Sequence, residues 1–332
     1  MEKEILGLSQ QDTFVQISRY RAELMGYAIL GVFVCHVVMR TDISSFLIAT
    51  IPRLVYTQGF LFLSGFGLYY SFSKDNSLSH FFKKRICRLF IPYVLISFPF
   101  FLIICLNEKQ SILDLLGYLT TFAFWCKGNF YGMWYIAVTI AMYLLFPLMY
   151  RWIFNRVEGR IFRGVILLIV YLMLIILLKE ELPNYYAKIG SWIKKTWMFP
   201  IGIICGYISK SEVKSRFTKY MVILPLIIFL FVVTKIRFYF FYEYARSFIG
   251  IFFLPILFSF NSNYIFLRTI NNILSWLGKY SLELYILHVL IFKTIYYFKP
   301  NSMAVEMVVS ILIALIICVP VHKQVNRIIA KL

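Results

Sequence analysis

One histidine in the first long apolar segment is the residue whose type and place best suit chemistry. His36 lies in the run GYAILGVFVCHVVM, ten residues after Gly26 and near the end of that segment. Ionisable side chains inside a membrane are rare and costly, so each is a functional candidate by default. Imidazole, with an ordinary pKa of about 6.5, is the usual general base near neutral pH. Two interpretations stay open: a general base, or a histidine that hydrogen-bonds a neighbouring helix.

Two arginines three positions apart form a second candidate site. Arg85 and Arg88 occur in HFFKKRICRLFIPY, where an inner loop is expected to enter the third helix. A helix would place both on one face, and two planar guanidinium groups suit a phosphate. Pro92 is expected in the first turns of that helix, where a missing N–H matters least. The alternative is a basic anchor that touches anionic lipid.

A third candidate lies near the C-terminus, in LGKYSLELYILHVLIF. Glu283 and His288 are both inside this apolar segment. They are five residues apart, or about 140° around a helix, and therefore do not share a face. Each is expected to have a partner on another helix, and Glu283 could equally be a structural buried acid.

Two further segments combine aromatic and small residues. Trp134 and Tyr135 begin GMWYIAVTIAMYLLFP and are expected, by default, to form an aromatic belt at a membrane boundary. The segment GFLFLSGFGLYYS, residues 59–71, is rich in small residues, which allow close helix packing or clear space for a ligand. These small residues are Gly59, Ser64, Gly65, Gly67 and Ser71.

The composition requires that membrane helices position these residues. The chain has 332 residues, of which 61% are hydrophobic and 15% charged, and the mean hydropathy is +0.78. Soluble domains carry roughly 45–50% apolar and about 25% charged residues, which excludes an ordinary soluble protein. The net charge of +19 fits a membrane protein better than a nucleic-acid-binding one at this hydropathy.

Apolar runs predict an all-α integral membrane protein with about ten transmembrane helices in one bundle around a central cavity. The segment 111–125 contains Asp114 and is predicted to be an interfacial or re-entrant helix. The polar segment 261–279 is expected to be an inner loop. The predicted helices are 22–39, 54–73, 89–106, 132–154, 164–178, 192–209, 220–234, 245–260, 280–298 and 303–321.

Lysine and arginine are more frequent in alternate connecting segments, above all 74–88 and 151–163. Since cytoplasmic loops carry the excess of positive charge, both termini are predicted to be cytoplasmic. The domain boundaries expected from this are a cytoplasmic segment 1–20, a transmembrane domain 21–322 and a cytoplasmic tail 323–332.

The sequence lacks the motifs that are typical of several other classes of protein. No GxxxxGK[ST], HExxH or GxSxG occurs, and the six cysteines have no zinc-ligand spacing and are expected to be reduced packing residues. No metal site and no nucleic-acid partner are expected. A transporter or flippase of glycan intermediates shares the basic loops and intramembrane ionisable groups, and it remains the alternative to an enzyme.

Taken in order, these segments resemble the membrane acyltransferase-3 family over nearly the whole chain. The opening helix with Arg21, Gly26 and His36, the segment GFLFLSGFGLYYS, the entry KKRICRLFIPY, the tryptophan-led helix WYIAVTIAMYLLFP and the late LGKYSLELYILH each fit a family motif. Two positions depart from the family's pattern. Met25 occupies the place of its usual basic residue, and Thr139 the place of a carboxylate found in some members.

The resemblance implies a bacterial inner-membrane O-acyltransferase that moves an acyl group, commonly acetyl, from acyl-CoA to a hydroxyl of a surface glycan or lipid-linked glycan. His36 is then the general base, and Arg21, Arg85 and Arg88 are donor contacts. No permanently bound cofactor is implied, and membrane lipids are the surrounding partner. Supporting or cavity-lining roles are implied for Trp134, Glu283 and His288.

Overall fold

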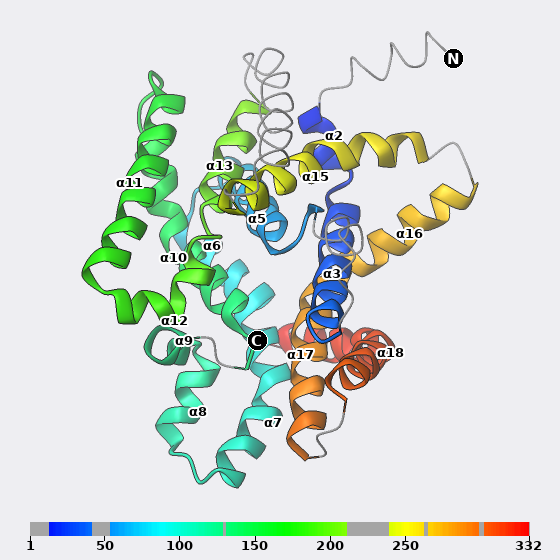
Figure 1. Ribbon diagram of the computed structural model, residues 1–332. Coiled ribbons are helices and arrows are strands. Elements are labelled where there is room, and N and C mark those ends of the chain that lie inside the picture. Colours follow the sequence, from blue (N-terminus) through cyan, green and yellow to red (C-terminus); the bar gives the residue numbers. More distant parts are fainter. Residues whose placement is uncertain are drawn as a thin grey trace. The chain divides into compact units, whose positions relative to one another are not determined.

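The computed structural model describes residues 13–41, 54–128, 131–210, 239–261, 265–298 and 302–331. These residues are almost entirely helical, and no strand occurs among them (Figure 1). They belong to two compact units, Met1–Tyr70 with Ile201–Ser281, and Ser71–Pro200 with Leu282–Leu332. We call these unit 1 and unit 2. The predicted all-α membrane fold is therefore confirmed.

Unit 1 contains α2 (Thr13–Arg19), α3 (Arg21–Val38), most of α5 (Thr57–Phe72), most of α13 (Met198–Ile208), α15 (Tyr239–Asn261) and α16 (Ile265–Lys279). Unit 2 contains α6 (Leu78–Arg85), the π-helix η2 (Ile86–Phe90), α7 (Ile91–Asn107), α8 (Ile112–Leu119), α9 (Phe122–Lys127), α10 (Trp134–Phe154), α11 (Arg160–Glu181), α12 (Pro183–Ile193), nearly all of α17 (Ser281–Phe298) and α18 (Met303–Ile329).

Among the described residues, six helical stretches are long and apolar enough to cross a membrane, by length and composition. Three other predicted spans, 54–73, 192–209 and 245–260, coincide with described helices that are too short or too polar to be counted among these six. The predicted span 220–234 lies outside the described residues. The predicted span 192–209 begins late, because a turn at 194–197 separates α12 from α13. The six stretches are Arg21–Val38, Leu78–Asn107, Trp134–Phe154, Arg160–Glu181, Ser281–Phe298 and Met303–Ile329.

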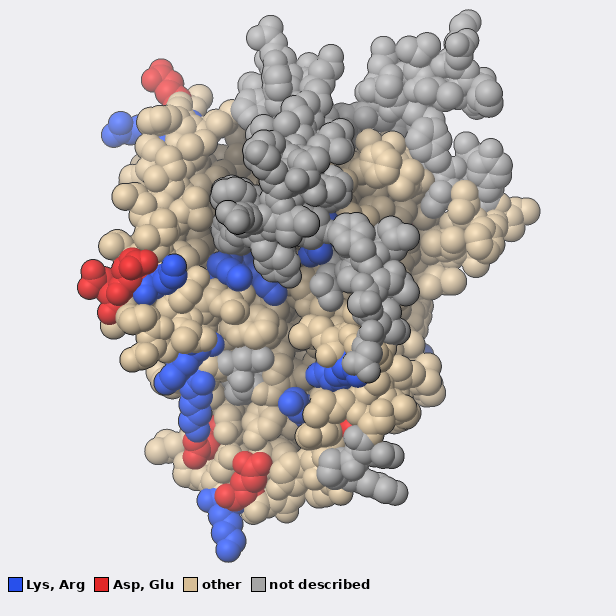
Figure 2. All heavy atoms as spheres, viewed as in Figure 1, with Lys and Arg blue, Asp and Glu red and all other residues tan. Residues whose placement is uncertain are grey.

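The surface fits a lipid environment. Residues that are neither acidic nor basic cover most of the described surface in Figure 2, and Lys and Arg occur in separate patches. On α11 Gly164 is the buried position, so the rest of this apolar helix is at least partly exposed within the described chain. Apolar side chains on such a helix are stable when acyl chains rather than water surround them.

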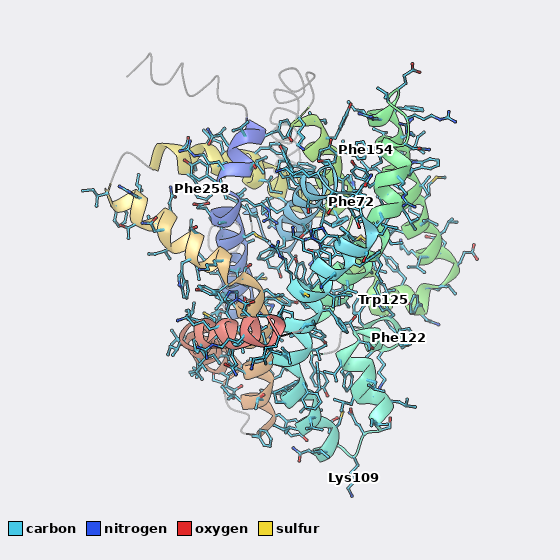
Figure 3. All side chains as sticks on the ribbon, turned by 180° about the vertical axis from the view of Figure 1, so that it is seen from behind. Phe72, Lys109, Phe122, Trp125, Phe154 and Phe258 are labelled. Carbon is cyan, nitrogen blue, oxygen red and sulfur yellow. The ribbon has the colours of Figure 1, made fainter. Side chains whose placement is uncertain are left out.

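Aromatic rings and backbone contacts hold unit 1 together. Phe252 on α15 packs edge-on against Phe14 on α2, at 5.8 Å between ring centroids, and against Phe62 on α5, at 6.0 Å. The amide Nδ2 of Asn271 on α16 donates to the carbonyl oxygen of Phe258 on α15 over 2.9 Å. Figure 3 labels Phe258. This bond satisfies a polar side chain at a buried helix–helix contact.

Helix α16 corrects one expectation, since residues 261–279 were predicted to form a loop. Their apolar residues recur at helical spacing, as in Ile270, Leu274 and Leu277. Leu274 and Leu277 are buried, and the exposed side of the helix carries polar residues such as Arg268 and Asn272. Such a one-sided pattern is too polar for a spanning helix, yet it is typical of an amphipathic helix that packs on a neighbour.

Unit 2 has an aromatic core at the junction of α5, α6 and α10. The ring of Phe72 packs edge-on against Phe81 and Phe146, at 5.3 and 5.4 Å, and Phe81 stacks on Phe146 at 5.3 Å. Such aromatic pairs add roughly 0.5–1.5 kcal/mol each beyond the area they bury. They fix the end of α10 against α6.

The third predicted helix starts earlier than expected and contains a π-helix. One continuous helical stretch runs through Leu78–Asn107, and Pro92 lies within it rather than near its start. Proline has no N–H to donate and its ring collides with the carbonyl four residues earlier. The backbone widens just before it, so that the N–H of Ile91 bonds to the carbonyl of Ile86. This widening replaces the free helix start that the sequence predicted.

Segment 111–125 forms α8 and α9, of 8 and 6 residues, both too short to span a membrane, as predicted. Lys109 lies in the turn from which α8 runs back beside α7 (Figure 3). A reciprocal capping box between Ser111 and Asp114 begins α8. Hydrogen bonds from Lys127, at 2.6 Å, and from Ser111 lower the pKa of Asp114 to about 2.

Candidate active site

His36 is near the C-terminal end of α3 and its side chain is partly buried. Its backbone carbonyl accepts a hydrogen bond from Nη1 of Arg40 over 2.6 Å. The last carbonyls of a helix have no partner within the helix, so the arginine caps this end. A guanidinium thereby lies one helical turn beyond the imidazole-bearing residue. Arg40 was missed by the sequence analysis, although its spacing of four from His36 is the available signal.

Arg21 begins the same helix, at about 22 Å from His36 by the rise of 1.5 Å per residue. Its Nη2 donates to the backbone carbonyl of Leu63 on α5 over 3.5 Å. A Cβ added to Gly67 would lie 3.2–3.4 Å from the Arg21 guanidinium. The small residue at position 67 therefore clears space for a side chain of the protein itself.

Two glycines hold α3 against α16. A Cβ at Gly26 would lie 1.8 Å from the carbonyl oxygen of Leu274, and one at Gly278 would lie 1.9 Å from that of Ala22. Both contacts are with backbone, which cannot give way by a rotamer change. Figure 1 shows α16 meeting α3. Gly26 on α3 and Gly278 on α16 each touch the backbone of the opposite helix. Together they fix α3, the helix that carries His36.

The structure places Arg85 and Arg88 in different environments. Arg85 is partly buried, with its guanidinium carbon 5.4 Å from the centroid of Phe81 and 5.8 Å from that of Tyr143. Its Nη2 donates to Ser71 Oγ over 3.4 Å. Arg88 is exposed and falls inside η2. The wider turn of η2 changes the angular spacing of these residues from that of a regular α-helix.

Trp134 is not part of a lipid-facing belt, which corrects the default expectation. Its exposed fraction is 6% and that of Tyr135 is 8%. Trp134 stacks on Trp192 of α12 at 4.6 Å between centroids. Lys195 Nζ is 5.1 Å from the Trp134 ring and 5.2 Å from the Trp192 ring. This buried cation–π cluster joins α10 to the α12–α13 turn.

Glu283 has the partner on another helix that the sequence required. Its Oε1 is 2.6 Å from Nδ1 of His322 on α18, and Nε2 of His322 is 2.8 Å from Nδ2 of Asn326. Both contacts are satisfied when Nδ1 carries the proton and Nε2 accepts. His322 was missed, because nothing in its local sequence distinguishes it from a polar residue at the end of an apolar helix.

His288 is fully buried, and its Nδ1 lies 2.7 Å from the carbonyl oxygen of Leu284, one turn earlier on α17. One turn away, Tyr285 donates its hydroxyl to the carbonyl of Gly132 over 2.7 Å and packs against Tyr135 at 5.2 Å. These contacts fasten α17 to the start of α10. Glu283 and His288 therefore belong to separate clusters, as their spacing predicted.

The candidate residues fall into two groups, one in each compact unit. Unit 1 holds Arg21 and His36, and unit 2 holds Arg85, Arg88, Trp134, Glu283 and His288. Across the described ranges, no three His, Cys, Asp or Glu side chains gather in a way that could hold a metal ion.

A family model described as an acyltransferase domain matches residues 26–323. The chain belongs to the acyltransferase-3 family. The matched range begins at Gly26 and contains every candidate residue except Arg21. Neither the curated proteins nor the solved structures gave a match.

Membership in the acyltransferase-3 family, together with the apolar spanning helices, makes this protein a membrane acyltransferase. A transporter of glycan intermediates is not favoured, because the match is to an acyltransferase domain and covers nearly the whole chain.

Proposed function

We propose that this membrane acyltransferase moves an acyl group, acetyl in the simplest case, from acyl-CoA to a hydroxyl of a bacterial surface glycan or lipid-linked glycan, and that His36 is its general base. The observation that carries the proposal is a partly buried imidazole inside an apolar helix that two glycines fix in place. The acyltransferase family match supports the reaction class.

In the proposed reaction, the acceptor oxygen attacks the carbonyl carbon of the thioester while His36 removes the hydroxyl proton. The C–S bond then breaks, CoA leaves as a thiolate, and the proton held by His36 passes to the sulfur. A positioned general base contributes typically 10²–10⁴-fold to such a rate. Arg40, one turn beyond His36, supplies positive charge near the developing oxyanion in this proposal.

In this proposal the three arginines have different roles in binding the donor. Arg88 is exposed and reaches donor phosphates from solvent, whereas Arg85 is fixed on Phe81 and Tyr143 and shapes the donor path. Arg21 contributes charge at the opposite end of α3 from His36. Trp134, Glu283 and His288 have a supporting role in this proposal, since they hold the helices of unit 2 together through the contacts described above.

The experiment compares purified wild type with His36→Ala in detergent, using acetyl-CoA as the donor. We expect the variant to bind acetyl-CoA as tightly as the wild type does, and to lose about 10²–10⁴-fold in thioester turnover. His80→Ala is the matched control, because His80 is exposed at the start of α6 and pairs with Asp75. Turnover equal in His36→Ala and His80→Ala would refute the base role, and a wild type that binds no acyl-CoA would refute the donor.

A further inference from the structure

A small pocket in unit 2 contains residues that have no part in the chemical step proposed above. Its volume is about 140 Å³. It lies at the loop between α5 and α6, beside the C-terminal end of α10. An apolar cavity of about 150 Å³ holds one benzene ring, so an open pocket of this size can cover part of a larger flat aromatic group whose remainder stays at the surface. The lining residues are Phe72, Asn76, Tyr150, Arg151, Phe154 and Asn155.

The walls of the pocket are aromatic and its polar groups lie at the surface. Tyr150 is 4.9 Å from Phe72 and 4.7 Å from Phe154, measured between ring centroids. Figure 3 labels Phe72 and Phe154, which α5 and α10 contribute. Asn76 and Asn155 are exposed, and their amides make no side-chain hydrogen bond within the part of the chain that the structure describes.

This combination fits a purine nucleotide. Rings of the protein stack on any base, and a side-chain amide can pair with the N6 and N7 edge of adenine through two hydrogen bonds. The exposed guanidinium of Arg151 suits a phosphate attached to that base. A purely lipidic ligand would contact the rings alone and would gain no hydrogen bond from the two exposed amides.

The pocket also adjoins the arginine assigned to the donor path. Phe81 packs on Phe72, a pocket wall, at 5.3 Å, and lies 5.4 Å from the Arg85 guanidinium. One aromatic ring therefore separates the pocket from Arg85. The pocket residues lie in or next to segments 74–88 and 151–163, which the positive charge predicts to be cytoplasmic.

We propose that this pocket binds the adenine nucleotide end of the acyl-CoA donor. Asn76 and Asn155 recognise the edge of the base, the cluster of Phe72, Tyr150 and Phe154 packs against it from one side, and Arg151 contacts phosphate. The inference rests on the proposed function, since it assumes acyl-CoA as the donor. It assigns to residues 72–76 and 150–155 the recognition of the nucleotide, apart from the acyl chemistry.

The test compares two donors that differ only in the nucleotide, acetyl-CoA and acetyl-pantetheine. In the double variant Asn76→Ala with Asn155→Ala, we expect kcat/KM for acetyl-CoA to fall about tenfold, because two hydrogen bonds to the base are lost. The value for acetyl-pantetheine should not change. Binding of 3′,5′-ADP, measured by calorimetry, should weaken by a similar factor. Asn184→Ala, at an exposed asparagine of α12, is the matched control.

The outcomes separate this inference from the proposed function. Suppose that the wild type transfers acetyl from acetyl-CoA, and that the ratio of kcat/KM for acetyl-CoA to kcat/KM for acetyl-pantetheine is the same in the double variant as in the wild type. The pocket assignment is then wrong and the proposed function stands. An equal fall for both donors would mean a structural defect and would also overturn the assignment. If the wild type neither binds nor uses acetyl-CoA, the proposed function itself fails.

Discussion

The buried carboxylate of Glu283 is paired with a residue of another helix rather than left alone in the apolar interior. The Glu283 side chain is 6% exposed and the His322 side chain 27% exposed, so the pair connects the interior with the surface, where Asn326 lies. Isolated charges inside a membrane are expensive, and carboxylates there pair with one another or with basic groups. The need for a partner could be predicted at Glu283, but the identity of the partner could not.

We expect Glu283 and His322 to be energetically coupled. In a double-mutant cycle of Glu283→Ala and His322→Ala, the coupling should be about 1–2 kcal/mol, the range of a hydrogen bond with a charged partner. Unfolding by denaturant in detergent measures it. Lys323→Ala is the control, since Lys323 is exposed and adjacent to His322 on the same helix. Purely additive losses from Glu283→Ala and His322→Ala would show that the contact contributes nothing.

At the scale of elements, the position of α3, the helix that carries His36, depends on backbone contact between α3 and α16. The sequence predicted α3 from its apolar length, and it marked Gly26 and Gly278 as parts of two separate motifs. Only the packing shows that each glycine touches the opposite backbone. Small residues allow helix backbones to approach closely, and van der Waals contact then replaces the hydrophobic effect, which is absent between helices in lipid.

Replacing either of these glycines with alanine should destabilise the protein by about 1–3 kcal/mol, as overpacking of a close contact does. Gly26→Ala should also reduce turnover, because the added methyl group would displace α3 and with it His36. Gly117→Ala on α8 is a matched control: its Cβ would have its nearest neighbour at 3.7 Å, and alanine is the better helix former by about 1 kcal/mol. Thermal unfolding in detergent and acetyl transfer measure both effects. A Gly26→Ala protein as stable and active as Gly117→Ala would contradict the packing argument.

For the whole molecule, the distribution of Lys and Arg predicts its orientation. Segments 74–88 and 151–163 are expected on the cytoplasmic side, and 107–131 on the outer side. The cysteines provide natural reporters of this orientation. Cys126 is exposed on α9, Cys87 is partly buried in η2, and Cys35, Cys105, Cys205 and Cys318 are buried.

A membrane-impermeant maleimide added to intact bacterial cells should therefore label Cys126 and no other cysteine. Cys87 should react only after the membrane is permeabilised, and then slowly because it is partly buried. Mass spectrometry of the purified protein identifies the labelled position, and Cys126→Ser provides the control. Labelling of Cys87 in intact cells would reverse the predicted orientation.

The sequence by itself determined the properties that belong to single segments. Composition and apolar length established a helical membrane protein, and the described helices coincide with most of the predicted runs. The short helices of 111–125 could be predicted for the same reason. Motif order established the family and marked His36, Arg85 and Glu283 as candidates. Hydropathy and helical period are local, so one segment carries the information.

The tertiary structure decided which distant residues meet. It paired Glu283 with His322, 39 residues apart, set Gly26 against α16, and buried Trp134 on Trp192. It also converted the helix start expected near Pro92 into a π-helix within a longer helix. The physical reason is that a side chain's partner depends on how helices pack, and packing is a property of both surfaces at once. No single segment of the sequence contains both.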